Sequence, residues 1–376
     1  MTASRSSDPA RPAGRGLHYK IYTSDEGFGH LVRQRAINDQ LQALCPGLGT
    51  TLQTKTHMRA AKLIFGDITF EEKFNNISWA KTPSGTPDLE TISKDYADYL
   101  ERSDAHIAAD AGVEDYAFVV SDFVYEAFEI ANSQDVPVFG VAHHTWDWFF
   151  SKLYPLPVRT TVLRRLQQQA RSAQQLYFPP LTPPDILNAY QDNCQEVPLI
   201  VRERTDKLSV TAKQDFKVLI LDSGSRLLSG RMQQALEQLH TIEDIHFFVP
   251  EYFGIKADNV TLIGNDEVLL DYMPEMDLVV CRAGFNTISE CIAHRTPLLL
   301  VGEALNPEME SNMLLMKQHG LASFTPLEKL ADRFGPTLYD FLDSEYDLVK
   351  RHMVDHDIRT DGARVVAEDI LNRVLG

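Results

Sequence analysis

The 376-residue chain has few cysteines, and it lacks any long run of apolar residues. The cysteines, Cys45, Cys194, Cys281 and Cys291, lie far apart and form no Cys-x-x-Cys pair. This spacing disfavours a disulfide scaffold and a zinc site, and it is typical of the reduced thiols of a cytoplasmic protein. No stretch approaches the roughly 20 apolar residues of a membrane-spanning helix. We therefore expect no membrane span.

Basic residues are also in deficit. The chain has 36 Lys and Arg against 53 Asp and Glu, which gives a formal net charge of −17. A field of this sign repels the phosphates of nucleic acid, so we expect no nucleic-acid partner, although a local basic pocket can still hold one phosphorylated small molecule. Residues 1–16 are rich in Ser, Pro, Arg and Gly without an apolar core. This composition predicts a disordered tail rather than a secretory signal.

Hydrophobic residues are plentiful at 44%, and short apolar runs alternate with longer amphipathic stretches. The length favours two domains, and the alternation predicts two parallel, doubly wound sheets with helices on both faces. We expect the first domain over residues 17–204 and the second over residues 205–376. Residues 151–186 carry proline clusters around a Gln/Arg-rich helix and show no strand pattern. The expected strands are 19–24, 50–56, 117–122, 136–144, 217–223, 245–250, 260–264, 277–281 and 296–302.

The segment TSDEGFGHLVRQRAI, Thr23 to Ile37, leads from a predicted strand into a helix through Gly29 and His30. Glycine at such a turn lets a ligand approach the backbone, with the helix N–H groups facing it. Asp122 follows another apolar strand, at the edge where open α/β sheets bind ligands. A carboxylate beside an imidazole fixes its tautomer and raises its basicity, as a general base requires. The alternatives are a plain turn with a surface histidine, and an Asp122 that only caps the next helix.

Histidine and tryptophan side chains follow the next predicted strand in VAHHTWDWFF. These are His143, His144, Trp146 and Trp148. They either line a pocket for an acceptor molecule or pack as a hydrophobic lid between the domains.

Two turns in the second half are typical of phosphate sites. Ser223, Gly224 and Ser225 lie between a predicted strand and a predicted helix, where backbone N–H groups can hold an anion. The pattern is short and unspecific.

The second turn lies in VVCRAGFNTISECIAH, residues 279–294. Thr287 and Glu290 match a capping box, so helix capping alone explains both. Arg282 and Gly284 have no capping role, and together with the helix N–H groups they fit a diphosphate-binding turn. Glu290 would then accept hydrogen bonds from two ribose hydroxyls. The motif by itself does not decide between these interpretations.

The ordered set of motifs resembles a known family. CRAGFNTISECIAHRTPLLLV, followed by NPEMESNMLLMKQHGLA, resembles the carboxyl half of GT-B glycosyltransferases, and the peptidoglycan N-acetylglucosaminyl transferase family is the nearest general relative. DEGFGHLVRQRAI resembles the amino-terminal loop of that class. More closely, about residues 18–325 are similar to the glycosyltransferase-like domain that precedes the sugar kinase in plant arabinokinase. VVSDFVYEAFEIA, HHTWDWFF, VPLIVRE and LNPEMESNMLLM correspond to that domain in the same order.

This resemblance implies a GT-B fold, in which two Rossmann-like parallel-sheet domains face each other across a cleft and the last helix can pack back on the first domain. It implies a nucleotide-diphosphate sugar, foremost a UDP-sugar, in the second domain and a small-molecule acceptor in the first. His30 matches the position of the general base, and Asp122 matches its acidic partner. The residues at donor-site positions are Gly29, Ser223, Gly224, Ser225, Arg282, Gly284, Asn286, Thr287, Glu290, Glu308 and Asn312.

One position departs from the family pattern. Many relatives carry an Asp/Glu-Gln-x-x-Asn arrangement whose carboxylate and amide bind the sugar hydroxyls. Here Glu308 is followed by Met309, while Asn312 keeps the last position. The amide is missing, which leaves the identity of the sugar open.

We therefore expect an inverting glycosyltransferase in which His30 deprotonates an acceptor hydroxyl and Asp122 orients His30. No metal and no resident cofactor are expected, because helix N-termini and Arg282 can stabilise the departing diphosphate and no Asp-x-Asp pair lies in a suitable loop. The alternatives are a nucleotide-sugar epimerase or hydrolase, and a regulator that binds a nucleotide sugar. The sequence leaves the nucleobase, the acceptor and the oligomeric state open.

Overall fold

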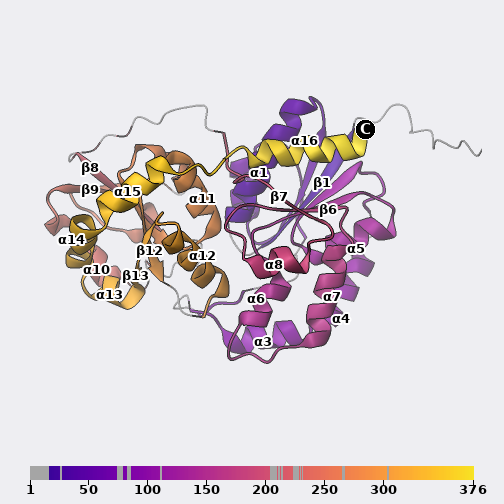
Figure 1. The fold of residues 1–376 in the computed structure, drawn as a ribbon, viewed down its shortest axis with the longest axis horizontal. Coiled ribbons are helices and arrows are strands. Elements are labelled where there is room, and N and C mark those ends of the chain that lie inside the picture. The colour runs from indigo at the N-terminus through magenta and orange to yellow at the C-terminus, as the bar shows by residue number, and fades with distance from the viewer. Residues whose placement is uncertain are drawn as a thin grey trace, which may run out of the picture.

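Two parallel sheets, one in each half of the chain, organise the structure, which is a computed structural model (Figure 1). It describes residues 17–25, 28–73, 79–82, 86–110, 112–203, 210, 212, 215–222, 228, 230, 232–264, 267–302 and 305–376.

The first sheet has the strand order β3-β2-β1-β4-β5-β6-β7, and all its pairings are parallel. Its central strands are almost wholly buried, as expected for a parallel sheet that is covered on both faces. The strand order reverses between β1 and β4, which makes their carboxyl ends the switch point of this sheet. The strands are β1 (His18–Thr23), β2 (Gly49–Gln53), β3 (Thr69–Glu71), β4 (Phe118–Asp122), β5 (Val138–Val141), β6 (Gln175–Phe178) and β7 (Cys194–Glu196).

Alternate residues of the first sheet pack into two separate cores. Tyr19 and Ile21 of β1 pack with α1 and α2, whereas Tyr22 packs with α3 to α7 on the other face. Side chains of a strand point alternately to opposite faces, which explains the division. The helices of this domain are α1 (Phe28–Leu44), α2 (Met58–Phe65), α3 (Leu89–Ala97), α4 (Tyr99–Ala109), α5 (Tyr125–Ser133), α6 (Trp146–Lys152), α7 (Thr160–Arg171) and α8 (Pro184–Ala189).

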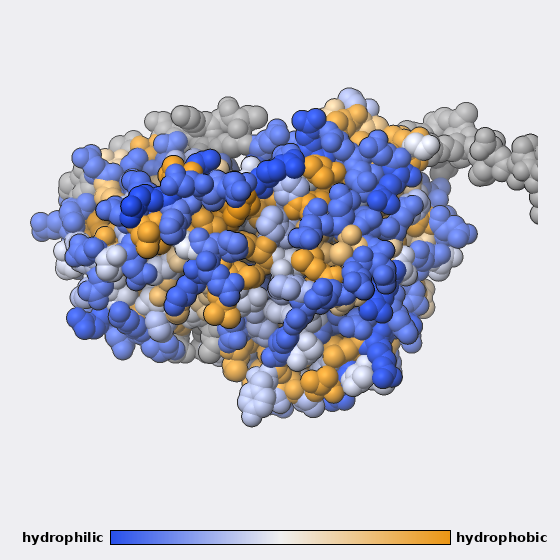
Figure 2. Space-filling model, in the orientation of Figure 1, coloured by the Kyte–Doolittle hydropathy of each residue, from blue (hydrophilic) through white to orange (hydrophobic). Residues whose placement is uncertain are grey.

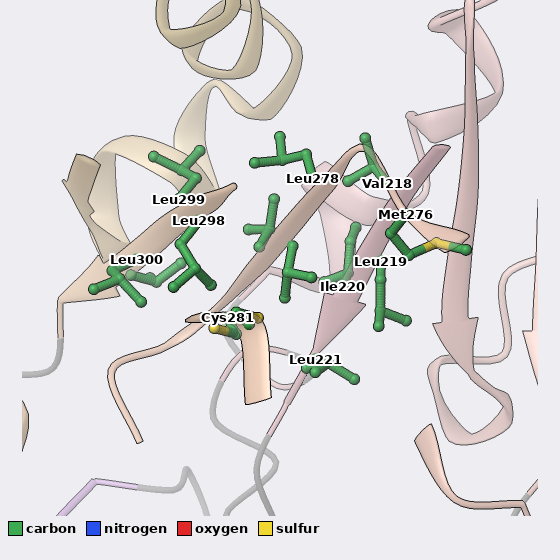
Figure 3. Close-up of a cluster of buried hydrophobic side chains, with 14 of the residues drawn as sticks. Val218, Leu219, Ile220, Leu221, Met276, Leu278, Cys281, Leu298, Leu299 and Leu300 are labelled. Carbon is green, nitrogen blue, oxygen red and sulfur yellow. The ribbon is translucent and has the colours of Figure 1, made fainter. Parts of the chain in front are cut away.

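The second sheet has the order β10-β9-β8-β11-β12-β13, again with parallel pairings only. Its switch point lies between β8 and β11. Figure 3 shows the aliphatic core, in which Leu219, Leu278 and Leu299 come from three neighbouring strands. The strands are β8 (Phe216–Leu221), β9 (Ile245–Pro250), β10 (Val260–Ile263), β11 (Leu278–Arg282), β12 (Leu298–Gly302) and β13 (Ser323–Pro326).

Short helices surround the second sheet. They are α10 (Gln233–Leu236), η1 (Leu239–Thr241), η2 (Glu251–Phe253), η3 (Leu269–Glu275), α11 (Phe285–His294), α12 (Pro307–Gln318), α13 (Leu327–Asp332), α14 (Phe334–Ser344) and α15 (Tyr346–Asp355).

The last helix, α16 (Gly362–Leu375), leaves the second domain and lies along the first (Figure 1). Val366 and Ile370 join the core that contains β1 and α1. Asp369 accepts a hydrogen bond from Tyr177 of β6 at 2.6 Å. The end of the chain therefore ties the two domains together.

The predicted fold of two parallel-sheet domains is confirmed. The structure adds four strands that the sequence analysis missed, namely β3, β6, β7 and β13. The prediction of no strand in residues 151–186 is wrong, because β6 lies there and is fully buried. Each missed strand has only three or four residues, too few for a periodic pattern to stand out.

The first sheet ends with β7 at Glu196 and the second begins with β8 at Phe216. The predicted boundary at 204/205 falls between them, and the predicted tail of residues 1–16 lies outside the described residues.

No helix in the described part of the chain is long and apolar enough to cross a membrane. All four cysteines are free thiols. Figure 2 shows that hydrophilic residues cover most of one face, with smaller hydrophobic patches, several near the junction of the domains.

Candidate active site

The predicted base and its partner lie at the switch point of the first sheet. Asp122 is the last residue of β4 and is paired with Thr23, the last residue of β1. His30 lies in the first turn of α1, the helix that follows β1. Open α/β sheets bind their ligands at this point, because the crevice opens between the two diverging connections.

His30 and Asp122 form a direct hydrogen bond. The Nδ1 atom of His30 lies 2.7 Å from Oδ1 of Asp122, which is completely buried. An ionised carboxylate can only accept, so Nδ1 carries the proton and Nε2 becomes the basic nitrogen. The His30 side chain is 16% exposed. It therefore has the tautomer and the access that a general base needs.

Asp122 receives further hydrogen bonds from α1. Arg33 donates to it through Nε at 3.0 Å and Nη2 at 2.5 Å, and Gln34 donates through Nε2 at 3.0 Å. Burial would raise the pKa of Asp122, but Arg33 and His30 outweigh this effect and hold the pKa below its usual range. Arg33 Nη2 also lies 3.2 Å from Nδ1 of His30, but both are donors to Asp122, so this contact is not a hydrogen bond.

The alternative of Asp122 as a helix cap is wrong. The N-cap of α5 is Val124, and no side chain caps that helix. Phe123, which follows Asp122 directly, has a φ of 45°, a conformation that is unfavourable for a bulky side chain. The chain thus turns sharply after the carboxylate, which stays aimed at α1.

The sequence analysis missed Arg33 and Gln34 as members of this site. A usable signal was present, because residues 30, 33 and 34 have the i, i+3, i+4 spacing that places side chains on one face of a helix. Arg33 is 1% exposed although it is charged.

The histidines that follow β5 contact the second domain. His143 Nε2 lies 2.8 Å from Oε1 of Glu308, in the first turn of α12. The His143 ring stacks on Phe285, the first residue of α11, with 4.0 Å between ring centroids and 8° between planes. Arg33 Nη1 lies 3.3 Å from Nδ1 of His143. His143 therefore links Arg33, which contacts Asp122 in the first domain, to Glu308 and Phe285 of the second domain.

A metal ion does not fit this group well. The possible ligand atoms of His143, His144 and Glu308 lie within 4.8 Å of one another. A neutral histidine that binds metal through Nε2 must carry its proton on Nδ1 and usually donates it to an acceptor. Here Nδ1 faces the guanidinium of Arg33, which has no acceptor atom. The contacts favour a hydrogen bond from His143 to Glu308.

Trp146 and Trp148, predicted to lie near the acceptor, are buried in the core of the first domain. Asp147 between them accepts hydrogen bonds from Tyr125 and Tyr190 at 2.9 and 2.8 Å. The Trp146 ring contacts His144, with centroids 5.7 Å apart. A role of the two tryptophans in acceptor binding stays a prediction.

The turn after β11 lies at the switch point of the second sheet. Helix α11 begins at Phe285, and its N-cap is Gly284, with no side-chain cap. The capping-box interpretation is therefore wrong, because Thr287 lies inside the helix. Among the described residues beyond its own chain neighbours, no atom lies within 4 Å of the place that a Cβ on Gly284 would take. The N-terminus of α11 is thus open to a ligand, and its N–H groups favour an anion.

Gly29 has a different role from Gly284. A Cβ on Gly29 would lie 2.4 Å from Nδ2 and 3.0 Å from Cγ of Asn286. The starts of α1 and α11 therefore touch, and the absent side chain at Gly29 allows the two domains to approach. Asn286, a predicted donor-site residue, takes part in this contact.

Arg282 is the last residue of β11 and is 3% exposed. Burial lowers its pKa to about 10, so the guanidinium stays charged at neutral pH. Its Nη2 lies 3.4 Å from the sulfur of Met309, which is buried. Asn312 donates to the carbonyl of Ala283 at 2.8 Å and so supports the turn from behind.

Glu290 faces the segment between the domains. It is 2% exposed, and its Oε1 lies 3.4 Å from the backbone N of Arg202 and 3.8 Å from the Arg202 Nε. His294 lies 3.6 Å from the other carboxylate oxygen. Ribose binding by Glu290 stays a prediction. Ser223, Gly224 and Ser225 lie outside the described residues.

Known proteins resemble this chain in both sequence and fold. Residues 212–343 match the family model of the glycosyltransferase family 28 C-terminal domain. A protein of Methanosarcina acetivorans, named "Uncharacterized glycosyltransferase", is 26% identical over 220 residues, which are 54% of this chain. The matched stretch spans 57% of that relative's length.

Solved glycosyltransferases share the whole architecture. The kitacinnamycin glycotransferase has a TM-score of 0.62 at 16% identity, covering 96% of this chain and all of that one. Phytolacca americana UGT2, solved with UDP-2-fluoro-glucose and pterostilbene, has a TM-score of 0.61 at 14% identity with the same coverage. MurG of Acinetobacter baumannii has a TM-score of 0.53 at 13% identity, covering 95% of this chain and all of that one.

The chain therefore has the GT-B fold, and its second domain matches a glycosyltransferase family model. The particular similarity to plant arabinokinase stays a prediction.

Proposed function

We propose that this protein transfers a sugar from a nucleotide-diphosphate sugar, foremost a UDP-sugar, to a hydroxyl of a small-molecule acceptor. The observation that carries the proposal is the hydrogen bond between His30 and Asp122 at the end of the first sheet. Helix α1, which contains His30, also contacts the N-terminus of α11, where an anion can bind. A general base and an anion-binding helix terminus are the two components that such a transfer needs.

In this mechanism the Nε2 atom of His30 removes the proton of the acceptor hydroxyl. The acceptor oxygen then attacks the anomeric carbon from the face opposite the diphosphate. The new glycosidic bond forms as the bond to the diphosphate oxygen breaks, and the configuration inverts. Asp122 stabilises the imidazolium that results, since it is ionised and already bound to Nδ1.

The negative charge that develops on the diphosphate is stabilised by the second domain. The N–H groups of α11 at Gly284 are open, and Arg282 provides a nearby positive charge. We propose that these groups replace a metal ion. The bound UDP-2-fluoro-glucose and pterostilbene of the Phytolacca americana structure support a UDP-sugar and a small hydroxylated acceptor. We also propose a cytoplasmic location, which agrees with the free thiols.

The test is to incubate the purified protein with UDP-glucose, UDP-galactose or UDP-N-acetylglucosamine, with and without a panel of phenols and monosaccharides, in the presence of EDTA. We expect UDP and a glycosylated product by mass spectrometry only when an acceptor is present. Free sugar without an acceptor would identify a hydrolase, and a changed sugar still attached to UDP would identify an epimerase. Binding without any turnover would identify a regulator. Each of these three outcomes contradicts the proposal.

A further inference from the structure

His143 is bound from both domains at once. From its own domain, Nη1 of Arg33 lies 3.3 Å from its Nδ1. From the second domain, Oε1 of Glu308 lies 2.8 Å from its Nε2, and the Phe285 ring stacks on its ring with 4.0 Å between centroids. His143 is 2% exposed and Phe285 is 3% exposed. A separation of the domains would therefore remove two close partners of His143 and open its ring to water.

The second domain fixes the position of the proton on the His143 ring. Burial would raise the pKa of Glu308, but the neighbouring histidines outweigh this effect and hold the pKa below its usual range. Glu308 is thus ionised and can only accept, so the proton of His143 lies on Nε2. Burial lowers the pKa of His143, so the ring is neutral at pH 7. Its Nδ1 is therefore unprotonated and accepts from Arg33, which can only donate.

Arg33 connects His143 to the predicted base. Its Nε and Nη2 atoms donate to Asp122 at 3.0 and 2.5 Å, and Asp122 accepts from Nδ1 of His30 at 2.7 Å. Arg33 Nη2 lies only 3.2 Å from the same Nδ1, so a small shift of the guanidinium changes the charge that the imidazole faces. Arg33 is 1% exposed, and a buried donor that loses its partner is costly. The contact with His143 thus holds the guanidinium in its place.

We propose that His143 is a positioning residue, through which contact with the second domain completes the His30–Asp122 base. The second domain binds His143 by its ring and by its Nε2, and His143 holds the guanidinium beside the base. When the domains separate, both contacts from the second domain are lost. The inference rests on the proposed function, because it takes His30 as the base. The acceptor-binding role predicted for His143 and His144 stays a prediction.

This arrangement limits the activity of the base to the closed state of the two domains. A base that was complete in the open state could activate water and hydrolyse the donor, and closure of an active site prevents such side reactions. The same closure brings α1 to the start of α11, where a Cβ on Gly29 would lie 2.4 Å from Nδ2 of Asn286. Contact between the domains therefore brings the base to the donor side and completes it in one step.

The direct measurement is the exchange of the Nδ1 proton of His30 with water, followed by nitrogen-edited NMR of the whole chain. This proton is bonded to a buried carboxylate, so its exchange rate reports how firmly the pair is held. His143→Phe keeps a ring beside Phe285 but loses both hydrogen bonds, and we expect exchange to be at least about tenfold faster. His143→Gln should restore most of the protection, because its amide can accept from Arg33 and donate to Glu308.

Phe285→Leu tests the contribution of the second domain. Leucine keeps an apolar side chain at the start of α11 but loses the flat stack, in which the planes of the Phe285 and His143 rings lie 8° apart. We expect exchange of the His30 proton to be about threefold faster or more, since aromatic pairs stabilise by this amount. Phe324→Leu is the matched control, because Phe324 is an exposed phenylalanine of β13 in the same domain. It should leave the exchange rate unchanged.

Turnover and UDP affinity separate this inference from the proposed function. In the transfer assay, His143→Phe should lower kcat by about tenfold, and His143→Gln should recover most of it. Calorimetry should give the same UDP affinity for both variants and the wild type, because the start of α11 is unchanged. A wild type that binds no UDP would contradict the proposed function, while the exchange rates would still decide whether His143 supports the His30–Asp122 pair.

Three results would overturn the inference. Unchanged exchange in His143→Phe would mean that the base does not depend on His143. Equally fast exchange in His143→Phe and His143→Gln would mean that His143 only fills space. Fast exchange in His143→Phe with unchanged exchange in Phe285→Leu would mean that the contact between the domains has no part in it. Phe285→Leu removes no side-chain hydrogen bond, so it decides the question even if His143→Phe does not fold.

Discussion

The two switch points of the molecule meet at one junction but are built differently. At the end of β4, Asp122 gathers hydrogen bonds from His30, Arg33 and Gln34. At the end of β11, Gly284 leaves an open helix start, because no described residue beyond its chain neighbours lies within 4 Å of an added Cβ. At the switch point of the first sheet the functional groups are buried side chains, and at that of the second sheet they are backbone N–H groups. Substitutions should therefore disturb catalysis and folding at the first point, and ligand affinity at the second.

The largest effect is expected at His30. His30→Ala should lower turnover by about 10²- to 10⁴-fold, the usual range for loss of a general base. The substitution should not change the affinity for the donor, because the proposed mechanism assigns His30 to the acceptor side. Steady-state rates at saturating donor measure the effect.

His240→Ala is the matched control for this measurement. His240 is an exposed histidine of η1 that hydrogen-bonds only to the carbonyl of Glu237 among the described residues. It should leave turnover unchanged. Near-normal turnover in His30→Ala would show that another group acts as the base.

Asp122 should have the next largest effect, on stability. Asp122→Ala leaves Arg33 buried without its carboxylate, and breaking a buried pair in this way costs about 3–5 kcal/mol. Urea denaturation of the wild type and the variant measures this change in the free energy of unfolding. The double variant Asp122→Ala/Arg33→Met should recover part of the loss, since it removes the uncompensated charge. A single variant as stable as the wild type would show that the pair is not needed for folding.

The difference between the switch points also explains what the sequence could predict. Asp122 was identifiable because it ends a strand, and His30 because it begins a helix after a glycine turn; each lies within a short motif. Arg33 was missed although it shares a helix face with His30, because no local pattern shows that this face meets residue 122, 89 positions away. Gly29 was predicted to bind the donor, and the structure places it against Asn286 of the other domain, where an added Cβ would clash. Such long-range contacts leave no local pattern.

Glu126 provides a pH-dependent contrast to Asp122, four residues earlier. Burial raises the pKa of Glu126 from 4.5 to about 7, while that of Asp122 is lowered. A group with a raised folded pKa stabilises the fold below its unfolded pKa, and this stability is lost as the pH rises to the folded value. Wild-type stability should therefore fall by roughly 2 kcal/mol between about pH 4.5 and 7.

Glu126→Gln removes this titration. The melting temperature of the variant minus that of the wild type should be larger at pH 8 than at pH 5, because the amide carries no charge at either pH. Scanning calorimetry at the two pH values measures the difference. The same melting-temperature difference at both would mean that Glu126 titrates normally in the folded protein.

The smallest effects distinguish the two glycines. Gly29→Ala forces a shift of Asn286 and should cost about 1–3 kcal/mol, as overpacking usually does. At Gly284 no described residue obstructs an added Cβ, and the φ of −71° is one that any residue adopts. The stability of Gly284→Ala should therefore stay within about 0.5 kcal/mol of the wild type. Thermal unfolding compares the two. Equal destabilisation would contradict the difference in packing.

The second domain shows the other limit of sequence reasoning. The segment 279–294 was recognised as a turn into a helix, but its start was misplaced, because the Thr287–Glu290 spacing imitates a capping box. The observed N-cap is Gly284, three residues before Thr287, and the helix begins at Phe285, whose ring packs on His143. Local helix rules do not contain this contact between the domains.

The division of roles between the two switch points is tested most directly by titrating UDP into two variants, Gly284→Val and His30→Ala. The valine side chain would fill the open space at the start of α11, so we predict that UDP affinity falls by at least about tenfold, or 1.4 kcal/mol, in a protein that remains folded. His30→Ala should bind UDP as the wild type does. Unchanged UDP affinity in Gly284→Val, or lost affinity in His30→Ala, would contradict this account.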